Sequence, residues 1–238
     1  RFCIFVYMRI LITILFVVVL QFTAFTQNVF NTLLLDTMQI ISLDIEKLDS
    51  NYFIVASYSD GTRGTRIKKL NTYGNIVDEY ILHDQNLSIY ESVKTSIIVN
   101  NNNELVFLSD NYNYQNDSSN LILKCFDNNL NIIWEKGLLF DTLDILAYDI
   151  VQTSDNGYAI VGTRYTATKD YDGFLLKTDN QGNQQWIKYY GSVNTDRICN
   201  LIETNDGFMI AGSNRQYNQY YDNWYIVRTD TDGNVIWQ

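Results

Sequence analysis

Residues whose side chains perform catalysis or bind metals are few in this chain, and they do not cluster along it. His83 is the only histidine, so neither a serine–histidine–aspartate triad nor a metal site built on several histidines can be argued. The carboxylates are numerous but lie singly at turns, where solvated acids are expected rather than a general acid–base pair. No glycine-rich phosphate loop joins a strand to a helix. We therefore expect no catalytic residue, no metal site and no cofactor. The sequence favours a protein without enzymatic activity but leaves that question open.

The cysteines give no sign of a disulfide framework. Cys3 lies in the expected leader segment, whereas Cys125 and Cys199 occupy different positions in two repeat units. A disulfide between them would need Cα atoms within about 7 Å of each other. We expect two separate buried thiols.

The balance of charge excludes one class of partner. The chain of 238 residues has a formal net charge of −10 and no basic stripe that could neutralise phosphates, so nucleic acid is not expected as a partner. An acidic surface keeps an exported protein soluble and disfavours anionic membranes.

The N-terminus carries a targeting segment. The apolar run ILITILFVVVLQFTAFT follows Met8-Arg9 and ends in a small-x-small cleavage site, so Gln27 is the expected mature start. Residues 1–26 then hold upstream residues and a signal peptide that starts at Met8. The mature protein would be secreted or held at the cell surface, with no membrane insertion. The alternative is an uncleaved anchor, because Phe2–Ala24 has spanning length.

A repeat of about 50 residues organises the remainder, residues 27–238. KTDNQGNQQW begins at Lys177, and RTDTDGNVIW begins at Arg228, 51 positions later. More diverged copies of this turn are LNTYGNIVD at 70–78 and FDNNLNIIW at 126–134. The clearest unit holds four short runs rich in Ile, Val, Tyr and Trp, separated by turns of Gly, Asn and Asp. This pattern predicts four antiparallel strands.

Four strands per unit, with no helical periodicity between them, are typical of β-propeller blades. One four-stranded sheet cannot bury both of its faces alone, and stacked blades supply the missing core. We therefore predict an all-β fold, a β-propeller of four-stranded antiparallel blades in an incomplete ring of about four. A parallel β-helix is the alternative, but its coils are shorter and lack paired hairpin turns. The expected blades are residues 38–88, 89–141, 142–192 and 193–238, the last of them truncated.

The repeated D-x-x-G-N turn is expected to join strand three to strand four and to hold the blades together. Its glycine can take the positive φ of a hairpin with a bulge, and its aspartate can cap the turn amides. The tryptophan four positions after the glycine would pack between neighbouring blades. A calcium loop at residues 230–234 is the alternative, although it lacks the regular spacing of an EF-hand loop. The blade-docking residues are Asp179, Gly182, Asp230, Gly233, Trp134, Trp186 and Trp237, with Asp78 at the tryptophan position of the first unit.

A second match concerns the start of the repeat region. LLLDTMQIISLDI at 33–45 aligns without a gap with LLFDTLDILAYDI at 138–150, so residues 28–37 take the place of an outer strand. We expect Val29–Leu35 to close the ring of the complete protein as the outermost strand of its final blade. For this chain alone we expect an open or strained arc, with an unpaired edge that favours aggregation.

The third unit carries a family resemblance. The pattern GYAIVGT followed by DGFLLKTDNQGNQQWIKYYG resembles the repeated blades of secreted bacterial β-propeller proteins, many of which are exported by the type IX pathway with a C-terminal sorting domain. The D-x-x-G-x-x-x-W turn is similar to the tryptophan-docking motif of quinoprotein propellers. It departs from the Asp-box of sialidases, whose Gly-to-Trp spacing is shorter. The resemblance covers Gln39 to Gln238, is weak in the first two units and implies no catalytic residue.

Long polar loops after strand two of each unit are expected at one end of the sheets, because turns alternate between the two ends of an antiparallel meander. Binding sites commonly lie on such loops, and Tyr offers a rigid amphipathic contact. The alternative is that the tyrosines only reflect the composition of the chain. The loops are residues 59–64, 110–119, 164–172 and 214–223, and the candidate ligand-binding residues are Tyr112, Tyr114, Tyr165, Tyr171, Tyr217, Tyr220 and Tyr221.

These observations together predict a non-catalytic exported propeller, monomeric, that binds a polymer or a protein at the cell surface. The alternative function is a quinoprotein-type propeller oxidoreductase or another propeller enzyme. A pyrroloquinoline quinone site needs basic and metal-binding residues that converge on the axis, and the sequence shows no such cluster.

Overall fold

A computed structural model of the chain describes residues 39–59, 63–83, 96–113, 118–140, 145–165, 171–192, 194–216 and 221–238. All of these residues belong to one compact unit, Leu35–Gln238. They form strands and turns, and no described residue lies in a helix that could cross a membrane. The expected signal peptide and the expected closing strand Val29–Leu35 lie outside the described residues.

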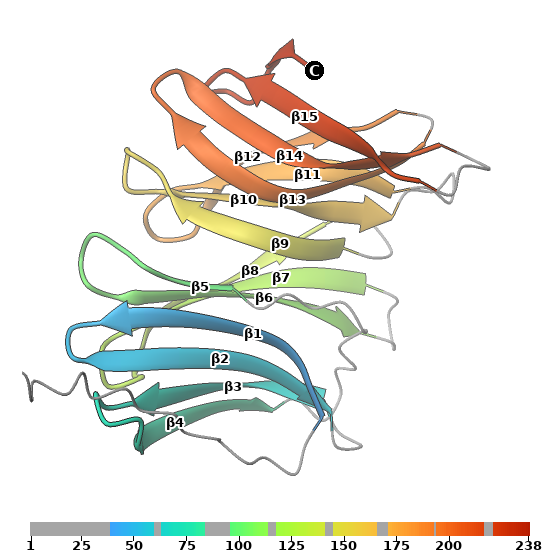
Figure 1. Cartoon of the computed structure of the whole chain (residues 1–238). Coiled ribbons are helices and arrows are strands. Elements are labelled where there is room, and N and C mark those ends of the chain that lie inside the picture. The colour runs from blue at the N-terminus through green and yellow to red at the C-terminus, as the bar shows by residue number, and fades with distance from the viewer. Residues whose placement is uncertain are drawn as a thin grey trace, which may run out of the picture. The chain divides into compact units, whose positions relative to one another are not determined.

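The strands form four sheets of four, each a meander in chain order (Figure 1). The first two sheets are built from β1 (Gln39–Leu48), β2 (Asn51–Ser59), β3 (Arg63–Leu70) and β4 (Ile76–His83), then β5 (Ser96–Val99), β6 (Leu105–Asn113), β7 (Ser118–Phe126) and β8 (Ile132–Leu139). The last two are built from β9 (Ile145–Gln152), β10 (Tyr158–Tyr165), β11 (Tyr171–Thr178) and β12 (Gln184–Tyr190), then β13 (Thr195–Thr204), β14 (Gly207–Arg215), β15 (Asn223–Thr229) and β16 (Val235–Trp237).

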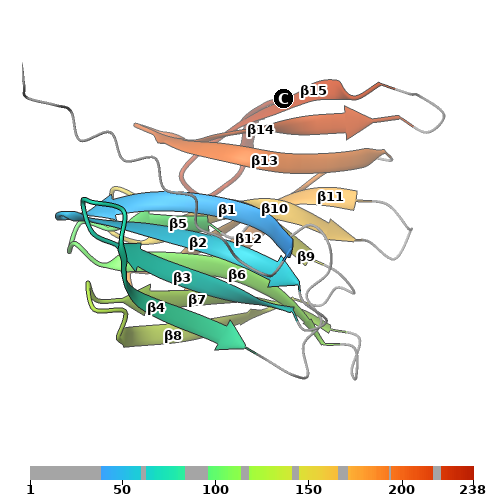
Figure 2. The same ribbon diagram turned by 60° about the horizontal axis from the view of Figure 1, so that its bottom comes forward.

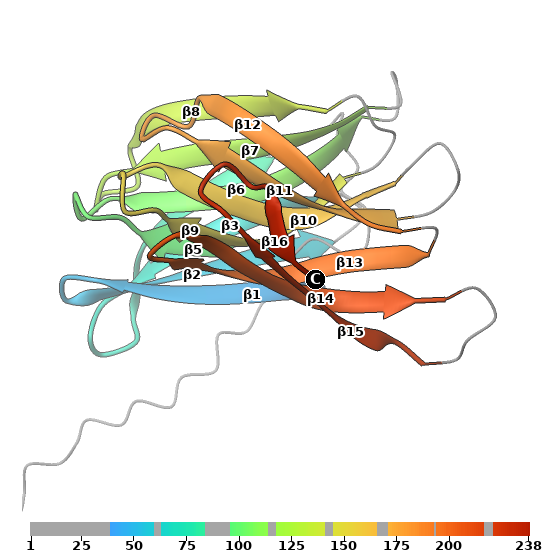
Figure 3. The ribbon, with the colours of Figure 1, turned by 90° about the horizontal axis from the view of Figure 1, so that it is seen from above.

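Every neighbouring pair of strands within a sheet is antiparallel, as Figure 2 shows for the first sheet. The predicted fold class, all-β with four-stranded antiparallel propeller blades, is therefore confirmed, and the parallel β-helix is excluded for the described sheets. The outer strand β16 is short and pairs only with the end of β15, as seen in Figure 3.

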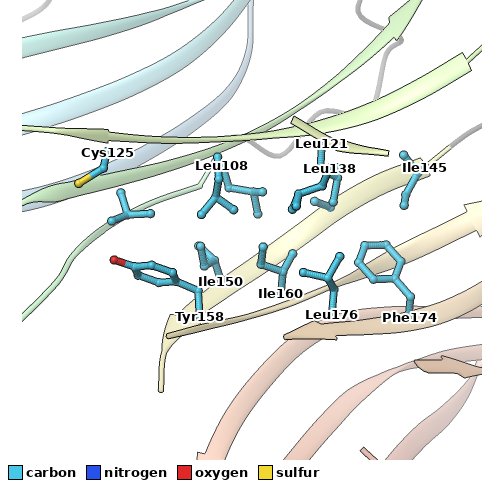
Figure 4. Close-up of a cluster of buried hydrophobic side chains, with 13 residues drawn as sticks. Leu108, Leu121, Cys125, Leu138, Ile145, Ile150, Tyr158, Ile160, Phe174 and Leu176 are labelled. Atoms are coloured by element: carbon cyan, nitrogen blue, oxygen red, sulfur yellow. The ribbon is translucent and has the colours of Figure 1, made fainter. Parts of the chain in front are cut away.

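Three apolar clusters join consecutive sheets. One lies between the first and second sheets and includes Phe53 and Phe107, and another lies between the third and fourth sheets and includes Leu175 and Ile210. In the middle cluster, Leu108 of the second sheet faces Ile160 of the third (Figure 4). Burying one such side chain contributes about 1.5–3 kcal/mol. None of the three clusters joins the fourth described sheet to the first, so the described sheets form an open series.

Acidic side chains on the first strands of two sheets, β1 and β9, form hydrogen bonds across these junctions. Asp44 of β1 accepts hydrogen bonds from the backbone N–H of Ile97 (3.0 Å) and from the Ser96 hydroxyl (3.1 Å) in the second sheet. Asp149 of β9 accepts one from the N–H of Leu201 (3.0 Å) in the fourth sheet. Asp44 and Asp149 occupy equivalent positions in the gap-free match between residues 33–45 and 138–150. Each of them bonds the backbone of the following sheet.

Tryptophan side chains lie directly against the turn glycines of the following sheet. A Cβ atom built on Gly182 would lie 2.8 Å from Cζ3 of Trp134, and one built on Gly233 would lie 2.8 Å from Cζ3 of Trp186. Both glycines also have positive φ, 77° and 75°. These two positions therefore need glycine for two independent reasons, backbone conformation and the close approach of an indole ring.

The junction between the first and second sheets is built differently. Asp78 occupies the tryptophan position in β4, and Leu130 stands where the other turns have glycine. Leu130 keeps the positive φ of the turn, at 58°, which costs about 1 kcal/mol or more for a residue with a Cβ. Its side chain is buried and belongs to the cluster against which Tyr80 and Leu82 of the first sheet pack. Leucine thus fills space that an indole ring fills at the other two junctions.

Candidate functional site

The two ends of each sheet hold different connections, but the longer loops expected at one end are not found in every sheet: the β6–β7 and β10–β11 connections are no longer than the β7–β8 and β11–β12 turns. One end, here called the turn end, holds the hairpins between strands one and two and the D-x-x-G-N turns. The other, here called the loop end, holds the connections between strands two and three and between successive sheets. Figure 1 shows the strand ends of all four sheets arranged in this way. Any binding surface shared by the connections between strands two and three and between sheets belongs at the loop end.

Side chains at the turn end are used within the turns themselves. Asp179 Oδ1 accepts hydrogen bonds from the backbone N–H of Gln181 (2.9 Å) and Asn183 (2.8 Å), and Asp230 makes the same contacts in the fourth sheet. The side-chain hydrogen bond from Asn234 is the largest effect that lowers the pKa of Asp230. Both oxygens of Asp230 are thereby engaged in its own turn, which fits a capping role rather than a cation-binding one.

A second device anchors the hairpin between strands one and two. Lys177 Nζ lies 2.9 Å from Asp155 and 2.8 Å from the carbonyl of Thr178, and Arg228 bonds Asp206 in the same way one sheet later. Burial raises the pKa of the Asp155 carboxyl, but hydrogen bonds from Thr153, Lys177 and the N–H of Gly157 outweigh it and lower the pKa to about 2. The charged side chains of these hairpins therefore bond to one another at the turn end, rather than facing outward where they could bind a ligand.

At the loop end of the third sheet the sequence-based prediction of a loop over residues 164–172 is partly wrong. Tyr165 ends β10, Tyr171 begins β11, and the two residues are paired across the strands. The β-propensity of Tyr and the ion pair between Arg164 and Asp172 (3.1 Å) extend the hairpin beyond the expected strand ends.

The paired tyrosines form the centre of a cluster that reaches the fourth sheet. The rings of Tyr165 and Tyr171 have centroids 5.0 Å apart. The guanidinium carbon of Arg197, which belongs to β13, lies 5.5 Å from the centroid of the Tyr171 ring. Tyr165, Tyr171 and Arg197 are called the forward trio below. Because it combines two sheets, the forward trio depends on the blade junction for its geometry.

The opposite face of the same hairpin carries a second arginine. Arg164 stacks on Tyr189 of β12, with its guanidinium carbon 3.4 Å from the ring centroid, and donates to Asp172. Such stacking contributes about 0.5–2 kcal/mol and holds the guanidinium in one plane. The two faces of this hairpin therefore each hold a Tyr–Arg contact.

A buried carboxylate holds the neighbouring backbone in place. Asp196, fully buried, accepts hydrogen bonds from the backbone N–H of Ser192 (2.6 Å), the Ser192 hydroxyl (2.9 Å) and the Asn214 amide (2.5 Å). Burial, followed by the nearby charges of Asp196 and Asp172, raises the pKa of Tyr225 to about 12. Ser192 and the start of β13, where Arg197 lies, are thus held together by bonds that involve no ligand.

The remaining predicted tyrosines are not brought into this cluster by the described residues. Tyr221 is 82% exposed beside the start of β15. Tyr112 lies near the end of β6, but its side chain is not among the parts that the structure describes. Tyr114, Tyr217 and Tyr220 lie outside the described residues altogether. Of the tryptophans predicted to dock between blades, Trp134 and Trp186 lie between sheets, and Trp237 is about half exposed on the fourth sheet.

Sequence reasoning missed Arg164, Arg197, Tyr189 and Trp224 as surface features. Trp224 is 89% exposed at the start of β15, at the position held by Gly173 in the third sheet. The sequence signal for Trp224 is that this tryptophan does not follow a D-x-x-G-N turn, so a role in blade docking does not account for it. The arginines gave none, because their stacking partners lie on other strands.

Metal and thiol chemistry are limited in the part of the chain that the structure describes. No group of three or more His, Cys, Asp or Glu side chains there could hold a metal ion. Cys125 and Cys199 are not joined by a disulfide, as expected, but only Cys125 is buried as predicted, and Cys199 is half-buried. Burial, with the nearby Glu104 carboxylate, raises the pKa of Cys125 to about 12, which makes it a poor nucleophile.

Comparison with known proteins gives a structural likeness only. No family model and no curated protein matches the chain. Among solved structures, the chain is similar to the β-propeller domain of the Trilobed protease from Pyrococcus furiosus, with a TM-score of 0.47 and 13% sequence identity. The match covers 84% of this chain and 58% of that one.

Proposed function

We propose that this chain is a non-catalytic, exported β-propeller that binds a polymer or a protein at the cell surface. The observation that carries the proposal is the forward trio, where two tyrosine rings and a guanidinium from two sheets lie together at the loop end. Tyrosine rings offer flat contacts to sugar rings and apolar side chains, and arginine binds carboxylates. Tyr221 adds an exposed ring at the same end.

The contrast between the two ends supports this assignment. Carboxylates at the turn end accept hydrogen bonds from their own turns. At the loop end of the third sheet, Tyr189 and Tyr171 stack on Arg164 and Arg197. Side chains that are not engaged in closing the turns are available for selective contacts.

Binding can be tested with the purified chain on a panel of soluble surface polysaccharides and cell-surface proteins, by calorimetry or biolayer interferometry. We expect at least one class to bind, and Tyr171→Ala to weaken that binding about tenfold through the lost stacking contact. Tyr73→Ala is the matched control, because Tyr73 is 68% exposed but lies in a turn at the opposite end of the sheets. Equal effects of the two variants would overturn the assignment of the site.

The enzymatic alternative has a separate test. Recovery of a bound quinone from the full-length protein, or dye-linked dehydrogenase activity, would replace the binding role with a quinoprotein oxidoreductase. We expect neither, since no described group of residues could hold the metal ion that such a site uses.

Export is the second part of the proposal. Expression in a bacterial host followed by N-terminal sequencing of the extracellular protein is expected to find Gln27 as the first residue. A protein that stays in the membrane fraction with Met8 or earlier residues intact would instead identify residues 2–24 as an anchor.

A further inference from the structure

Three buried hydroxyl groups lie in the junction between the first and second sheets. Ser57 and Thr65 belong to β2 and β3, and Ser109 belongs to β6. They are 2%, 1% and 3% exposed, and none of the three hydroxyl oxygens has a hydrogen-bond partner among the described residues. A buried hydroxyl without a partner is unfavourable, because it has given up its hydrogen bonds to water. A group of three therefore calls for an explanation.

All three side chains face the space between these two sheets. Side chains alternate between the two faces along a strand, so residues two apart share a face. Ser57 lies two residues after Val55, which belongs to the apolar cluster of this junction. Ser109 lies two residues after Phe107, which enters the same cluster from the second sheet. Thr65 is the direct cross-strand partner of Ser57 and therefore shares its face.

The hydroxyls also lie at the same level along the strands. The hydrogen bond from the backbone N–H of Ile97 to Asp44 (3.0 Å) fixes the two sheets relative to each other. Asp44 is paired with Val55 in the first sheet. Ile97 is paired with Phe107 in the second sheet, which places Val55 and Phe107 at matching levels. The two serines each follow two residues later, toward the loop end, so they face each other across the junction.

The junction between the third and fourth sheets has a single hydroxyl at this level. Thr163 corresponds to Ser57, since each lies two residues after the valine that pairs with the junction aspartate. The cross-strand partner of Thr163 is Gly173, where the first sheet has Thr65. Ile198 of the fourth sheet packs there, because a Cβ built on Gly173 would lie 2.3 Å from its Cδ1 atom. An apolar side chain thus occupies a level that is polar in the first junction.

Water is the ligand whose chemistry fits three hydroxyls. A buried water molecule needs two to four polar partners, and a hydroxyl can both donate a hydrogen bond to water and accept one from it. Directly opposite residues on antiparallel strands have Cβ atoms about 4.5–5.5 Å apart. One water molecule bridges two hydroxyls across such a span with hydrogen bonds of ordinary length. The serine of the facing sheet supplies a third partner.

We propose that this site binds water, at least one molecule that links the hydroxyls of Ser57 and Thr65 in the first sheet to that of Ser109 in the second. The bridge joins two sheets whose junction has Asp78 and Leu130 in place of the Trp–Gly contact. Hydrogen bonds through water thus hold the loop-end side of the first junction, where apolar packing holds the third. The site lies between the first two sheets and is independent of ligand binding at the forward trio.

A crystal structure of the purified chain tests the site directly. We expect electron density for a water oxygen about 2.6–3.2 Å from at least two of the three hydroxyl oxygens. A structure that shows other buried waters but has no density between these hydroxyls would overturn the proposal. A structure in which the three hydroxyls bond only to one another or to the backbone would overturn it as well.

Matched threonine-to-valine substitutions test what the bridge contributes to stability, with denaturant unfolding as the measurement. Thr65→Val removes one partner of the water and should raise the equilibrium constant of unfolding about tenfold. Thr163→Val is the control, because it removes a buried hydroxyl that has no described partner and no bridge to lose. It should leave the constant within about threefold of wild type or lower it. Both substitutions keep the shape of the side chain, so the fold should remain. Equal effects of the two variants would overturn the water bridge.

Discussion

The turn end and the loop end belong to the same sixteen described strands, yet the side chains at the two ends form different contacts. At the turn end, aspartates cap their own turns and indole rings lie on the glycines of the next sheet, so the contacts repeat at a fixed spacing. At the loop end, the described contacts of Arg164 with Tyr189 and of Arg197 with Tyr171 lie in the third sheet and at its junction with the fourth. The comparison teaches that side chains at the turn end are engaged in closing turns and joining sheets, whereas aromatic and arginine side chains at the loop end of the third sheet stack at the surface, where recognition can take place.

The largest expected effect comes from a glycine of the turn end. Gly182→Val adds a branched side chain at φ 77° and directs its Cβ to 2.8 Å from Trp134. We expect a loss of about 3 kcal/mol or more in the free energy of unfolding, from backbone strain and overpacking together. Denaturant unfolding measures it.

Gly137→Val is the matched control for that substitution. Gly137 lies in β8 of the same junction, and a Cβ built there would meet nothing within 4 Å. Valine suits an exposed strand position, so its effect should stay within about 0.5 kcal/mol. Similar losses at the two glycines would refute the docking role of the Trp–Gly contact.

A smaller effect is expected from rebuilding the first junction on the pattern of the others. Leu130→Gly removes a buried side chain but relieves a positive φ, for a net cost of about 1–2 kcal/mol. Asp78→Trp alone places an indole where Leu130 lies and should cost about 1–3 kcal/mol. The double variant should be more stable than the sum of the single effects by about 1 kcal/mol or more. Additive effects in this cycle would mean that Leu130 does not occupy the space of an indole.

Acid should weaken the turn end through Asp155. Its pKa in the folded chain, about 2, lies below that of an unfolded aspartate near 4, so the unfolded chain binds the proton first. The stabilisation is therefore complete above pH 4 and is lost as the pH falls toward 2. Thermal unfolding across this range should show a steeper decline for the wild type than for Asp155→Asn. Parallel curves for the two proteins would contradict the ionic anchoring of this hairpin.

The smallest effect on stability is expected at the loop end. Tyr171→Ala removes a partly exposed ring, its contact with Tyr165 and its cation–π contact with Arg197. Such contacts contribute about 0.5–1 kcal/mol at exposed sites. Denaturant unfolding should therefore place this variant well above Gly182→Val in stability. A loss as large as that of Gly182→Val would mean that the forward trio holds the sheets together.

The features predicted from the sequence are those that local chemistry repeats. The D-x-x-G-N spacing predicts the strand order and the sheet number, because each turn is closed by its own residues. The extent of the β10–β11 hairpin was predicted too short, since the Arg164–Asp172 pair and the Tyr165–Tyr171 pair stabilise it across strands rather than along the chain. The stacking of Arg197 on Tyr171 depends on the packing of two sheets and has no counterpart in local sequence.

The ligand affinities of two single-tyrosine variants test the central claim. This claim is that residues at the loop end bind the ligand, whereas residues at the turn end hold the sheets together. Tyr221 and Tyr73 are 82% and 68% exposed, and they lie at the loop end and the turn end respectively. Against the polymer or protein selected in the binding panel, calorimetry on Tyr221→Ala should show affinity reduced about tenfold, with Tyr73→Ala equal to wild type. Both variants should unfold within about 0.5 kcal/mol of wild type. Reduced affinity for Tyr73→Ala with Tyr221→Ala unaffected would contradict the account.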